Sequence, residues 1–578
     1  MSMYTNPFFT HYLSGMLENK NIPQVTTSDH IGASTLIKTL VQLGLRDVVI
    51  SPGSRNAPLT IAVAGNPLLR VHVVIDERAA GYVGLGLALE TGKPAIVICT
   101  SGTAAVNHGP AIAEAFHQRV PLISITADRP IRFAGAGHGQ TTSQQGIFSA
   151  TTVFSATIDE SEVNEIEIEN IAVKAWSSAI KGGSVHLNLP FEEPLYGSIK
   201  VESGGIIEGD LSKRDENDLR IPKCLVEQGS RAIVIAGPIG IWNHVNIASS
   251  KFNGIAGISE RYSGLYGDSL INSGDLFQIE KGHEPTAVIT VGLPSLSKSL
   301  RNQISSLKIP HVHVGMDGYG WDMFGTLQDS VKCDLGLWLK MFSNEVEQDE
   351  GFVKGFAELK RNQHRVHESF IKQVEWSDLK AFEAVFKSFN KSGSCDNTLH
   401  FANSTSARYA LFFDTENHFK VHANRGVAGI DGCTSTAVGH ALGKNGEGDV
   451  ILVSGDIAFL YDINGLASVQ ELPLNFKVIV VNNGGGGIFK WLEGPEKSGL
   501  LDKYFLTKPK TSIKAAARFC GVAYFCAEDY KSTEKGIVDL EKFDGPAILE
   551  IKTQPEISAK TYERYLRELR LIREHEQL

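Results

Sequence analysis

The sequence predicts an α/β protein built from doubly wound parallel sheets. Short runs of β-branched and apolar residues alternate with helix-like stretches along most of the 578 residues. Polar or glycine-rich turns follow these runs, as is usual where a buried parallel strand gives way to a helix. A chain of this length should form about three or four domains. We therefore expect three α/β units, each with its own parallel sheet.

The first unit is predicted to span residues 1–195. Its β-type runs are Asp47–Ile50, Val71–Asp76, Ala95–Cys99, Pro121–Thr126 and the closing run His186–Pro190. Polar turns follow the first four of them, at Ser51–Arg55, Glu77–Arg78, Thr100–Thr103 and Asp128–Pro130. Neighbouring parallel strands end along one edge of their sheet, so these turns should cluster and form a site.

The middle of the chain carries fewer motifs. Residues 196–220 are rich in Gly, Ser, Asp and Glu and are expected to be a linker. A second α/β unit, predicted for residues 221–375, contains the runs Ala232–Ala236, Ala287–Val291 and His311–Val314. The favoured role of this unit is that of a structural spacer. Charged, mostly helical residues then connect it to the last unit.

The last unit, predicted for residues 376–578, ends in a charged amphipathic helix. Here the run Val450–Ser454 leads into Gly455-Asp456, and the run Phe476–Val481 leads into Asn482-Asn483 and four glycines. The helix-like segment between the two runs has the length of one β-α-β crossover. Both runs should therefore end at the same sheet edge, which would bring Asp456 and Asn483 together.

These side chains predict a site for a divalent metal and a diphosphate. The Asp456 carboxylate and the Asn483 amide are hard oxygen donors, and the glycines allow the Gly485 carbonyl to turn inward. Three protein oxygens leave room for diphosphate oxygens and a water, as octahedral Mg²⁺ (or Mn²⁺) prefers. The alternative is an ordinary β-α-β unit with a glycine-rich loop, because Gly-Asp and Asn-Asn are common turn dipeptides.

Composition excludes several other classes of protein. The chain is 42% hydrophobic and 21% charged, which is ordinary for a globular protein, and its net charge of −10 argues against non-specific nucleic-acid binding. The seven cysteines include no C-x-x-C pair, which favours a reducing, cytoplasmic setting over a disulfide framework or a zinc site. We expect neither a signal peptide nor a membrane span.

The pattern from Gly455 to Asn483 resembles the thiamine diphosphate signature, Gly-Asp-Gly through Asn-Asn, with Ile457 in place of the second glycine. The resemblance implies that six residues bind the diphosphate and its metal: Gly455, Asp456, Ile457, Ala458, Asn483 and Gly485.

Glu77 resembles the glutamate that hydrogen-bonds the cofactor's aminopyrimidine ring in such enzymes. That acid favours the imino tautomer, whose nitrogen removes the thiazolium C2 proton. The alternative for Glu77 is an acid placed at a helix N-terminus by the macrodipole. Since two domains must face the two ends of one cofactor, the resemblance implies a homodimer at least, and a homotetramer by analogy with relatives.

Five stretches carry a further set of basic and polar residues: Ser51–Leu59, Ala127–Pro130, Leu293–Lys298, Asn403–Arg408 and Asn424–Gly432. Together they closely resemble one family, the 2-succinyl-5-enolpyruvyl-6-hydroxy-3-cyclohexene-1-carboxylate synthases of menaquinone synthesis. The likeness covers essentially the whole chain and is weakest in the middle.

The resemblance implies decarboxylation of 2-oxoglutarate and addition of the resulting carbanion to isochorismate. Both substrates are dicarboxylic acids, and guanidinium groups bind carboxylates bidentately. The residues expected to hold isochorismate are Arg55, Arg129, Gln140 and Lys298, and Ser54 is also expected to bind substrate. Those expected to hold the succinyl-derived part are Ser404, Arg408 and Arg425. Glu77, Ser54, Arg55, Arg408 and Arg425 are expected to be catalytic.

Three apolar residues complete the expected site. Ile430 matches the family's wedge that bends the cofactor, and Ile488 and Phe489 would line the wall beside it. Each has a plainer alternative, because Ile430 and Phe489 could be core residues. Any one arginine could equally be a solvated surface residue.

Three other functions compete with this reading. A thiamine diphosphate-dependent decarboxylase or acetohydroxyacid synthase would not need the arginines, and the adjacent His-His pair common in the decarboxylases is absent from the sequence. A non-catalytic diphosphate or nucleotide sensor would keep Asp456 and Asn483 without Glu77. A Rossmann dehydrogenase is disfavoured because Gly84-Leu-Gly86 falls inside a predicted helix.

Overall fold

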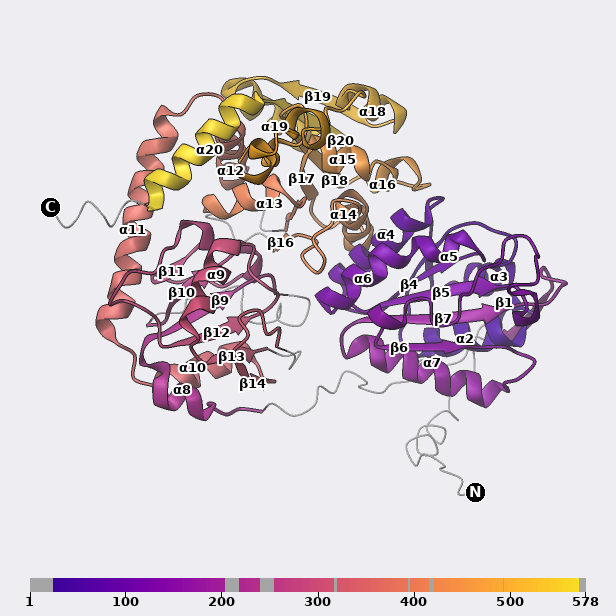
Figure 1. The fold of residues 1–578 in the computed structure, drawn as a ribbon. Coiled ribbons are helices and arrows are strands. Elements are labelled where there is room, and N and C mark those ends of the chain that lie inside the picture. The colour runs from indigo at the N-terminus through magenta and orange to yellow at the C-terminus, as the bar shows by residue number, and fades with distance from the viewer. Residues whose placement is uncertain are drawn as a thin grey trace. The chain divides into compact units, whose positions relative to one another are not determined.

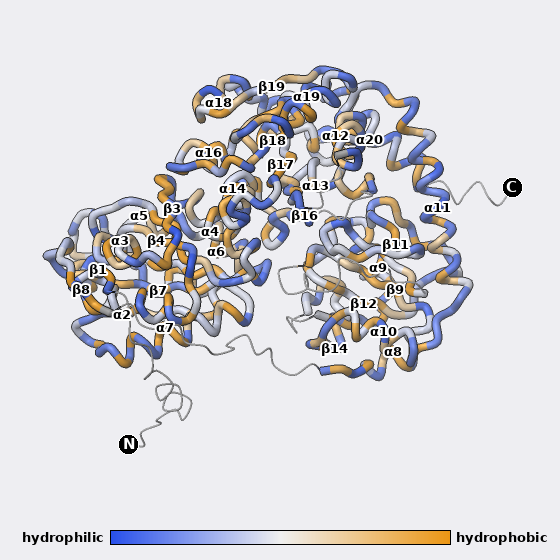
Figure 2. The backbone as a smooth tube through the Cα atoms, turned by 180° about the vertical axis from the view of Figure 1, so that it is seen from behind, coloured by the Kyte–Doolittle hydropathy of each residue, from blue (hydrophilic) through white to orange (hydrophobic). Residues whose placement is uncertain are grey.

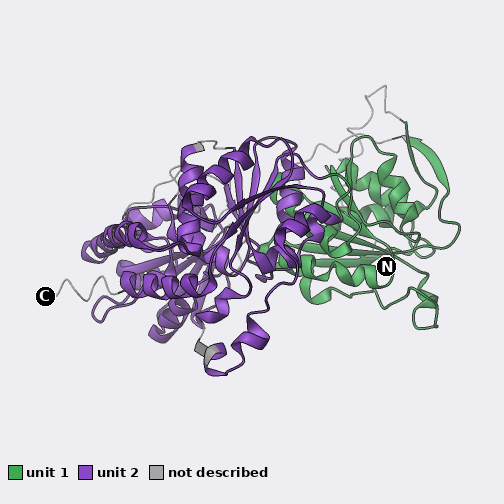
Figure 3. Cartoon of the chain, turned by 90° about the horizontal axis from the view of Figure 1, so that it is seen from above, with its two compact units in different colours: residues 1–214, 468–471 green, residues 215–467, 472–578 purple. Residues whose placement is uncertain are grey.

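The computed structural model describes residues 24–202, 218–239, 254–315, 320–392, 396–414, 420–491 and 493–570. The chain divides into two compact units, one of residues 1–214 with 468–471 and one of residues 215–467 with 472–578 (Figure 3). The described residues form three six-stranded sheets in which all strands are parallel, with helices against them (Figure 1). The predicted α/β class, with three parallel sheets, is confirmed.

The first unit holds one of these sheets, in the order β3-β2-β4-β5-β7-β6. Its strands are β2 (Asp47–Ile50), β3 (Arg70–Val73), β4 (Ala95–Cys99), β5 (Leu122–Asp128), β6 (Phe154–Thr157) and β7 (Ser184–Pro190). Its helices are α2 (Ile31–Gln42), α3 (Ala57–Ala64), α4 (Glu77–Thr91), α5 (Thr103–Asn107), α6 (Gly109–Gln118) and α7 (Glu165–Ile180), with 3₁₀ turns at Ile131–Phe133 and Ser149–Thr151. The predicted turns therefore do follow parallel strands that lie side by side.

Helix α4 lies unusually close to this sheet. A Cβ atom at Gly84 would stand 2.3 Å from Cγ1 of Val97 on β4, so a side chain at that position would push the helix away. Gly84 lies in the middle of α4, as predicted, and not at a strand-to-helix turn. Its role is packing rather than dinucleotide binding.

An antiparallel ribbon completes the first unit. Strand β1 (Gln24–Ser28) pairs with β8 (Ser198–Glu202). The stretch 196–220 was predicted to be a linker, and its residues 198–202 are instead this strand. The part of the predicted linker at 203–217 lies outside the described residues.

The second unit begins with a sheet in the order β11-β10-β9-β12-β13-β14. Its strands are β9 (Ala232–Ala236), β10 (Ala256–Ser259), β11 (Leu270–Ile271), β12 (Ala287–Val291), β13 (His311–Val314) and β14 (Leu327–Val331). The helices of this part are α8 (Lys223–Gln228), α9 (Lys298–Leu307), α10 (Leu335–Glu345) and α11 (Glu350–Gln373), with 3₁₀ turns at Gly229–Arg231, Arg261–Ser263 and Gly274–Leu276. We call this part the central domain.

The rest of the second unit, which we call the last domain, contains a sheet in the order β16-β15-β17-β18-β20-β19. Its strands are β15 (Thr398–Phe401), β16 (Lys420–His422), β17 (Val450–Gly455), β18 (Phe476–Asn482), β19 (Ala523–Ala527) and β20 (Ala547–Lys552). Its helices are α12 (Asp378–Ser392), α13 (Thr405–Tyr409), α14 (Cys433–Lys444), α15 (Asp456–Tyr461), α16 (Asn464–Ala467), α17 (Glu493–Lys497), α18 (Ile513–Phe519), α19 (Tyr530–Lys542) and α20 (Pro555–Arg570). Single turns of 3₁₀ or π helix occur at Ala410–Phe412, Gly487–Lys490 and Leu501–Phe505.

The first and last sheets share one strand order, and the central sheet has another. Numbered along the chain within each sheet, the first and last read 2-1-3-4-6-5 and the central one reads 3-2-1-4-5-6. The order reverses between β2 and β4 in the first sheet and between β15 and β17 in the last. Ligands of open α/β sheets bind at such a switch point, beyond the carboxyl ends of the strands. In the last sheet, Ser404 and Asp456 follow those two strands.

The central and last domains share one hydrophobic core. Tyr262, Leu276 and Leu296 of the central domain belong to the same buried cluster as many side chains of the last domain. Polar contacts support this joint: the Tyr262 hydroxyl donates to the Ala407 carbonyl at 2.8 Å, and Arg261 Nε donates to the Ala410 carbonyl at 3.1 Å. The two domains therefore form one body.

Two helices cover this joint with one face each. In Figure 2, α11 and α20 are largely hydrophilic with apolar residues interspersed. The apolar residues are the buried ones: Phe370 on α11, for example, meets Tyr565 on α20 with ring centroids 5.3 Å apart. Tyr562 stacks on Trp491 at 3.7 Å. The predicted C-terminal amphipathic helix thus serves packing.

Candidate active site

Asp456 lies buried at the end of β17, with 3% of its surface exposed. Its Oδ1 accepts the backbone N–H of Ile457 at 2.9 Å, whereas its Oδ2 meets no hydrogen-bond partner among the described residues. Burial raises the pKa of Asp456 to about 7, and the nearby Asp378 charge adds to the shift while backbone N–H groups of Ile457 and Gly485 oppose it. A buried carboxylate without a counter-charge is costly, so this geometry favours a cation beside it.

Asn483 follows the adjacent strand β18 and faces the same edge of the sheet. Its Nδ2 donates to Oδ2 of Asp378 at 2.8 Å, which turns its Oδ1 the other way. That Oδ1 is buried and meets no donor among the described residues. Asp378 in turn accepts the hydroxyls of Thr553 at 2.5 Å and Ser558 at 3.0 Å. Asp378 therefore orients the Asn483 amide so that its Oδ1, not its Nδ2, is available to a ligand.

The glycines after Asn483 are required by their surroundings. Gly485 has φ +138°, and a Cβ atom there would lie 2.3 Å from the Leu506 carbonyl oxygen. The Gly485 carbonyl accepts the Gly487 N–H at 2.7 Å, and a carbonyl oxygen has a second lone pair for a metal. We call Asp456, Asn483 and Gly485 the oxygen-donor cluster.

The oxygen-donor cluster fits a hard divalent cation. It offers two buried oxygens that meet no partner among the described residues, and a carbonyl beside them. These are the donor types that Mg²⁺ takes in preference to nitrogen or sulfur. At Gly455, next to Asp456, a Cβ atom would meet nothing within 4 Å, so there is open space where the diphosphate was predicted. No group of three or more His, Cys, Asp or Glu side chains suited to a metal occurs among the described residues.

The remaining residues of the last domain that were predicted to bind the cofactor are partly or fully buried. Ile457 is half-buried and Ala458 is buried in the first turn of α15. The predicted crossover helix is in fact two short helices, α15 and α16. Ile430 and Ile488 are half-buried, and the Phe489 ring contacts Phe505 at 5.4 Å.

Glu77 begins α4 in the first unit. The strand predicted to run to Asp76 ends at Val73, because Asp76 caps the helix by accepting the backbone N–H groups of Arg78 at 2.9 Å and Ala79 at 3.3 Å. Asp76, not Glu77, therefore performs the capping. Glu77 is half-buried, and its charge adds to the burial that raises the pKa of the Cys99 thiol.

Arg55 and Ser54 lie in the turn after β2 but differ in exposure. Ser54 is exposed, whereas Arg55 is buried and donates Nη1 to the Phe191 carbonyl at 3.0 Å and Nη2 to Glu193 at 3.1 Å. The guanidinium is thus held in place by the end of β7. Arg129, after β5, is half-buried, and its buried Nε meets no acceptor among the described residues.

Gln140 is held against the turn that follows β4. The Ser101 hydroxyl donates to its backbone carbonyl at 2.9 Å, and Gln140 has φ +59°. Ser404 in the second unit has φ +76°. Such backbone conformations are strained for residues other than glycine, and they gather at functional sites. Two predicted substrate-binding residues therefore share a costly conformation.

Sequence reasoning missed a buried network that ties these turns together. Gln144 accepts the Gly102 N–H at 2.9 Å and donates to the Ala127 carbonyl at 3.1 Å and to Asn188 at 2.9 Å. Asn188 donates to Asp128 at 2.9 Å, next to Arg129. Nothing in their sequence spacing marks these residues, because each acts through a turn far away in the chain.

The second unit contains three predicted cationic residues, Lys298, Arg408 and Arg425, which we call the cationic cluster. Lys298 is exposed at the start of α9. Arg408 Nη1 pairs with Asp275 at 3.0 Å, and Arg425 Nη1 donates to Asn403 Oδ1 at 2.8 Å. Asn403 also donates to the carbonyls of Asn424 and Gly429 and so links two of the stretches that carry the resemblance.

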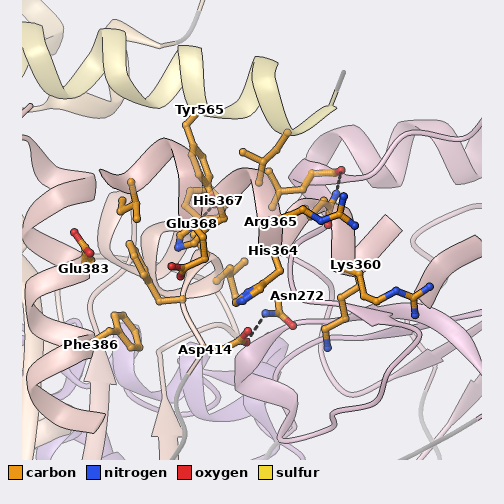
Figure 4. A pocket seen from close by; sticks show the side chains of 18 of the residues that line it. Asn272, Lys360, His364, Arg365, His367, Glu368, Glu383, Phe386, Asp414 and Tyr565 are labelled. Atoms are coloured by element: carbon orange, nitrogen blue, oxygen red, sulfur yellow. Dashed lines mark hydrogen bonds between the residues drawn. The ribbon is translucent and has the colours of Figure 1, made fainter. Parts of the chain in front are cut away.

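A pocket of about 710 Å³ lies elsewhere in the second unit, between α11, α12 and α20 (Figure 4). Its charged side chains include Lys360, Glu383 and Asp414, and Asn272 donates to Asp414 at 2.7 Å across it. None of the predicted site residues lines this pocket. It is therefore separate from the clusters described above.

Two family models match the chain and define its class. One, described as the N-terminal TPP binding domain of thiamine pyrophosphate enzymes, matches residues 31–150, and the C-terminal TPP binding domain matches residues 403–551. Thiamine pyrophosphate is thiamine diphosphate, so the cofactor predicted from Asp456 and Asn483 is confirmed. The chain is a thiamine diphosphate-dependent enzyme.

Curated relatives narrow this class to a single family. Proteins named 2-succinyl-5-enolpyruvyl-6-hydroxy-3-cyclohexene-1-carboxylate synthase are 34% identical in Flavobacterium johnsoniae, over 93% of this chain and 98% of the relative, and 34% identical in Cytophaga hutchinsonii, over 91% and 96%. One in Bacteroides thetaiotaomicron is 31% identical over 94% of this chain and 99% of the relative. The chain belongs to this synthase family, as the sequence predicted.

Within the part of the chain that the structure describes, no helix is both long and apolar enough to cross a lipid bilayer.

Proposed function

We propose that the protein catalyses the reaction for which its relatives are named, and forms 2-succinyl-5-enolpyruvyl-6-hydroxy-3-cyclohexene-1-carboxylate and CO₂ from 2-oxoglutarate and isochorismate. The observation that carries this proposal is the 34% identity over 93% of the chain to a synthase of that name. A match of such extent includes all three sheets, not the cofactor-binding domains alone.

The metal and the diphosphate are assigned to the oxygen-donor cluster. Asp456, Asn483 and the Gly485 carbonyl hold Mg²⁺ (or Mn²⁺). Support for this assignment comes from the adjacent strands β17 and β18, which Asp456 and Asn483 follow, and from the two buried oxygens of these residues that meet no partner among the described residues. Gly455, Ile457 and Ala458 border the diphosphate. When bound, thiamine diphosphate supplies the carbon that adds to a keto group and stabilises negative charge after CO₂ leaves.

Glu77 is assigned to the proton of the aminopyrimidine ring. Since Asp76 caps α4, the Glu77 carboxyl is not needed for capping, and it can accept a hydrogen bond from a ring nitrogen. Ile430, Ile488 and Phe489 form the apolar wall that excludes water beside the cofactor.

The substrates are assigned to the arginines. Ser54, Arg55, Arg129, Gln140 and Lys298 bind isochorismate, and Ser404, Arg408 and Arg425 bind the succinyl-derived part. Guanidinium groups held by protein acceptors, as Arg55 and Arg408 are, meet a carboxylate with their remaining donors in a fixed orientation. Of these, Ser54, Arg55, Arg408 and Arg425 act on the reacting groups together with Glu77.

Three further proposals follow from membership of the family. The domains are residues 1–195, 221–375 and 376–578, and the protein is at least a homodimer and forms a homotetramer. Its setting is the cytoplasm. Sedimentation equilibrium of the purified protein with thiamine diphosphate and Mg²⁺ tests the assembly, and a monomer would contradict it.

The decisive experiment measures CO₂ release from labelled 2-oxoglutarate with and without isochorismate. We expect release that depends on isochorismate, together with formation of the named product by mass spectrometry. Release from pyruvate in preference to 2-oxoglutarate would overturn the proposal in favour of another 2-oxoacid decarboxylase or carboligase. Tight cofactor binding without turnover of any oxoacid would favour a diphosphate sensor.

A further inference from the structure

The central domain presents two carboxylates toward the last domain, and neither was predicted from the sequence. Glu260 follows strand β10, and Asp275 lies in the 3₁₀ turn Gly274–Leu276. Both lie in the body that the two domains form around their shared core. Their hydrogen bonds lead to Arg408 and to the helix end that carries Lys298.

Asp275 connects two of these cations. Its Oδ2 pairs with Arg408 Nη1 at 3.0 Å, and its Oδ1 accepts the Ser297 hydroxyl at 2.6 Å. The Ser297 oxygen in turn caps helix α9 by accepting the Leu300 N–H at 3.1 Å. Since Lys298 is the first residue of α9, one carboxylate fixes both the Arg408 guanidinium and the helix end that carries Lys298.

Glu260 binds the residues just before Ser297, in the turn that leads into helix α9. It is fully buried, and its Oε1 accepts the Ser295 hydroxyl at 2.5 Å and the Leu296 N–H at 2.7 Å. Burial raises the pKa of Glu260 to about 7, and these hydrogen bonds and the positive charge of Arg425 oppose the shift. Glu260 therefore fixes the turn that leads to Lys298.

Tyr262 links the central domain to the backbone beside Arg408. Burial raises the pKa of its hydroxyl, and the positive charges of Arg425 and Arg408 both oppose that shift. The Tyr262 hydroxyl donates to the Ala407 carbonyl, one residue before Arg408. The central domain thus contacts the backbone as well as the side chain at this position.

We infer that Glu260 and Asp275 are positioning residues: Asp275 fixes the Arg408 guanidinium, and both carboxylates fix the turn that carries Lys298, so that these cations are placed to receive the substrate carboxylates. This inference rests on the proposed function, and it gives the central domain a part in substrate binding in addition to that of a spacer. Like charges brought close together repel, so a cationic cluster needs counter-charges to stay assembled before its substrate arrives. Arg408 uses one of its five N–H donors on Asp275, which leaves others for a substrate.

Asp275→Asn tests the inference with little change of shape. The amide keeps an oxygen for the Ser297 hydroxyl but loses the charge that holds Arg408. We expect kcat/KM for 2-oxoglutarate and isochorismate to fall by up to about 10²-fold, the cost of a small misplacement, mainly through KM. The affinity for thiamine diphosphate and Mg²⁺, measured by calorimetry, should stay at the wild-type value and shows that the variant is folded. Glu260→Gln is a second, independent variant with the same expected pattern.

Glu227→Gln is the matched control. Glu227 is an exposed carboxylate of the central domain that pairs with Lys223 at 3.4 Å on α8. Within the described parts of the chain, it makes no hydrogen bond or ion pair with Lys298, Arg408 or Arg425. Its loss should leave both substrates' KM unchanged.

A double-mutant cycle separates positioning from a general structural role. If Asp275 acts through Arg408, Asp275→Asn should cost much less in an Arg408→Gln background than in the wild type. Equal costs in the two backgrounds would overturn the inference. So would normal KM and kcat in both Asp275→Asn and Glu260→Gln beside an active wild type, which would leave the proposed function standing. A wild-type protein that releases no CO₂ from 2-oxoglutarate would overturn the function, and the inference with it.

Discussion

The first and last sheets have the same strand order, yet the predicted site residues that follow their strands differ in burial and in how their side chains are oriented. In the last domain, Asp456 and Asn483 are buried and oriented by Asp378 and by backbone N–H groups. In the first unit, Ser54 is exposed and Glu77 is half-buried at the start of a helix that Asp76 caps. Under the proposed assignments, the comparison teaches that the diphosphate end of the cofactor would meet a preformed site. The ring end, where the proton moves, would meet a more accessible carboxyl.

The largest effect is expected at the preformed site. Asp456→Ala removes a metal ligand, so Mg²⁺-dependent binding of thiamine diphosphate should be abolished in calorimetry. Asp449→Asn is the matched control, because Asp449 precedes the same strand β17 at its opposite end. Unchanged cofactor affinity in Asp456→Ala would break the comparison, since the buried carboxylate would then have no part in binding.

The second effect concerns the accessible site. Glu77→Gln should lower kcat by roughly 10²–10⁴-fold, the usual range for acid–base catalysis, and leave cofactor affinity nearly unchanged. Glu165→Gln is the control, because Glu165 is also the first residue of a capped helix, α7, but is exposed and distant in sequence from the predicted site. Equal, small losses of kcat in both variants would mean that Glu77 only interacts favourably with the helix dipole and has no part in catalysis.

A smaller effect tests how the preformed site is oriented. Asp378→Ala removes the acceptor that fixes the Asn483 amide, so Mg²⁺ affinity in the presence of thiamine diphosphate should fall by roughly 10–100-fold, as for other residues that orient metal ligands. Thr553→Val removes a different partner of Asp378 and should leave Mg²⁺ affinity near the wild-type value. Mg²⁺ affinity at the wild-type value in Asp378→Ala would mean that Asp378 is not needed to orient the Asn483 amide.

The smallest effect is on the stability of the first unit and depends on pH. His30 Nδ1 faces Glu160 at 2.5 Å and its Nε2 faces the Pro194 carbonyl at 2.9 Å, so both ring nitrogens meet acceptors. Burial opposes protonation, but the Glu160 contact and the Pro194 carbonyl outweigh it and raise the pKa of His30 above its usual value. The stabilisation is therefore complete below pH 6.5 and is lost as the pH rises through the raised pKa.

Thermal unfolding of the wild type and of His30→Gln, measured from below pH 6.5 to above the raised pKa of His30, tests this pH dependence. We expect the variant to be less stable by about 1 kcal/mol at low pH and the difference to shrink at high pH. A difference that does not change with pH would mean that His30 stabilises the first unit by packing alone.

The sequence predicted most of the buried strands but missed β10 and β15, and it missed most of the strands at the sheet edges. Runs such as Asp47–Ile50 and Ala287–Val291 are fully buried in parallel sheets and consist largely of β-branched residues, and the structure gives them the predicted bounds. Strand β6 was missed because it lies at a sheet edge and is partly exposed, so its composition is not distinctive. Strand β10 was missed for another reason: Gly257 lies on it, and a Cβ atom there would be 2.2 Å from the Val234 carbonyl oxygen.

The residues of the candidate site also differ in whether the sequence could reveal them. Asp456 and Asn483 could be found because each directly follows a predictable strand and the strands are adjacent. Asp378, Glu260 and Asp275 could not, because each acts on a residue far away in the chain through a hydrogen bond or a charge. Sequence spacing carries no trace of such contacts, and only the folded chain brings them together.

Helix α20 has a consequence for the order in which the protein matures on the ribosome. Tyr562 and Tyr565 of this helix lie in the core shared by the central and last domains, and Arg570 donates to the Asp275 carbonyl at 2.7 Å. These residues are synthesised after everything they pack against. The apolar side chains of the shared core that α20 covers therefore stay uncovered until this helix has been synthesised.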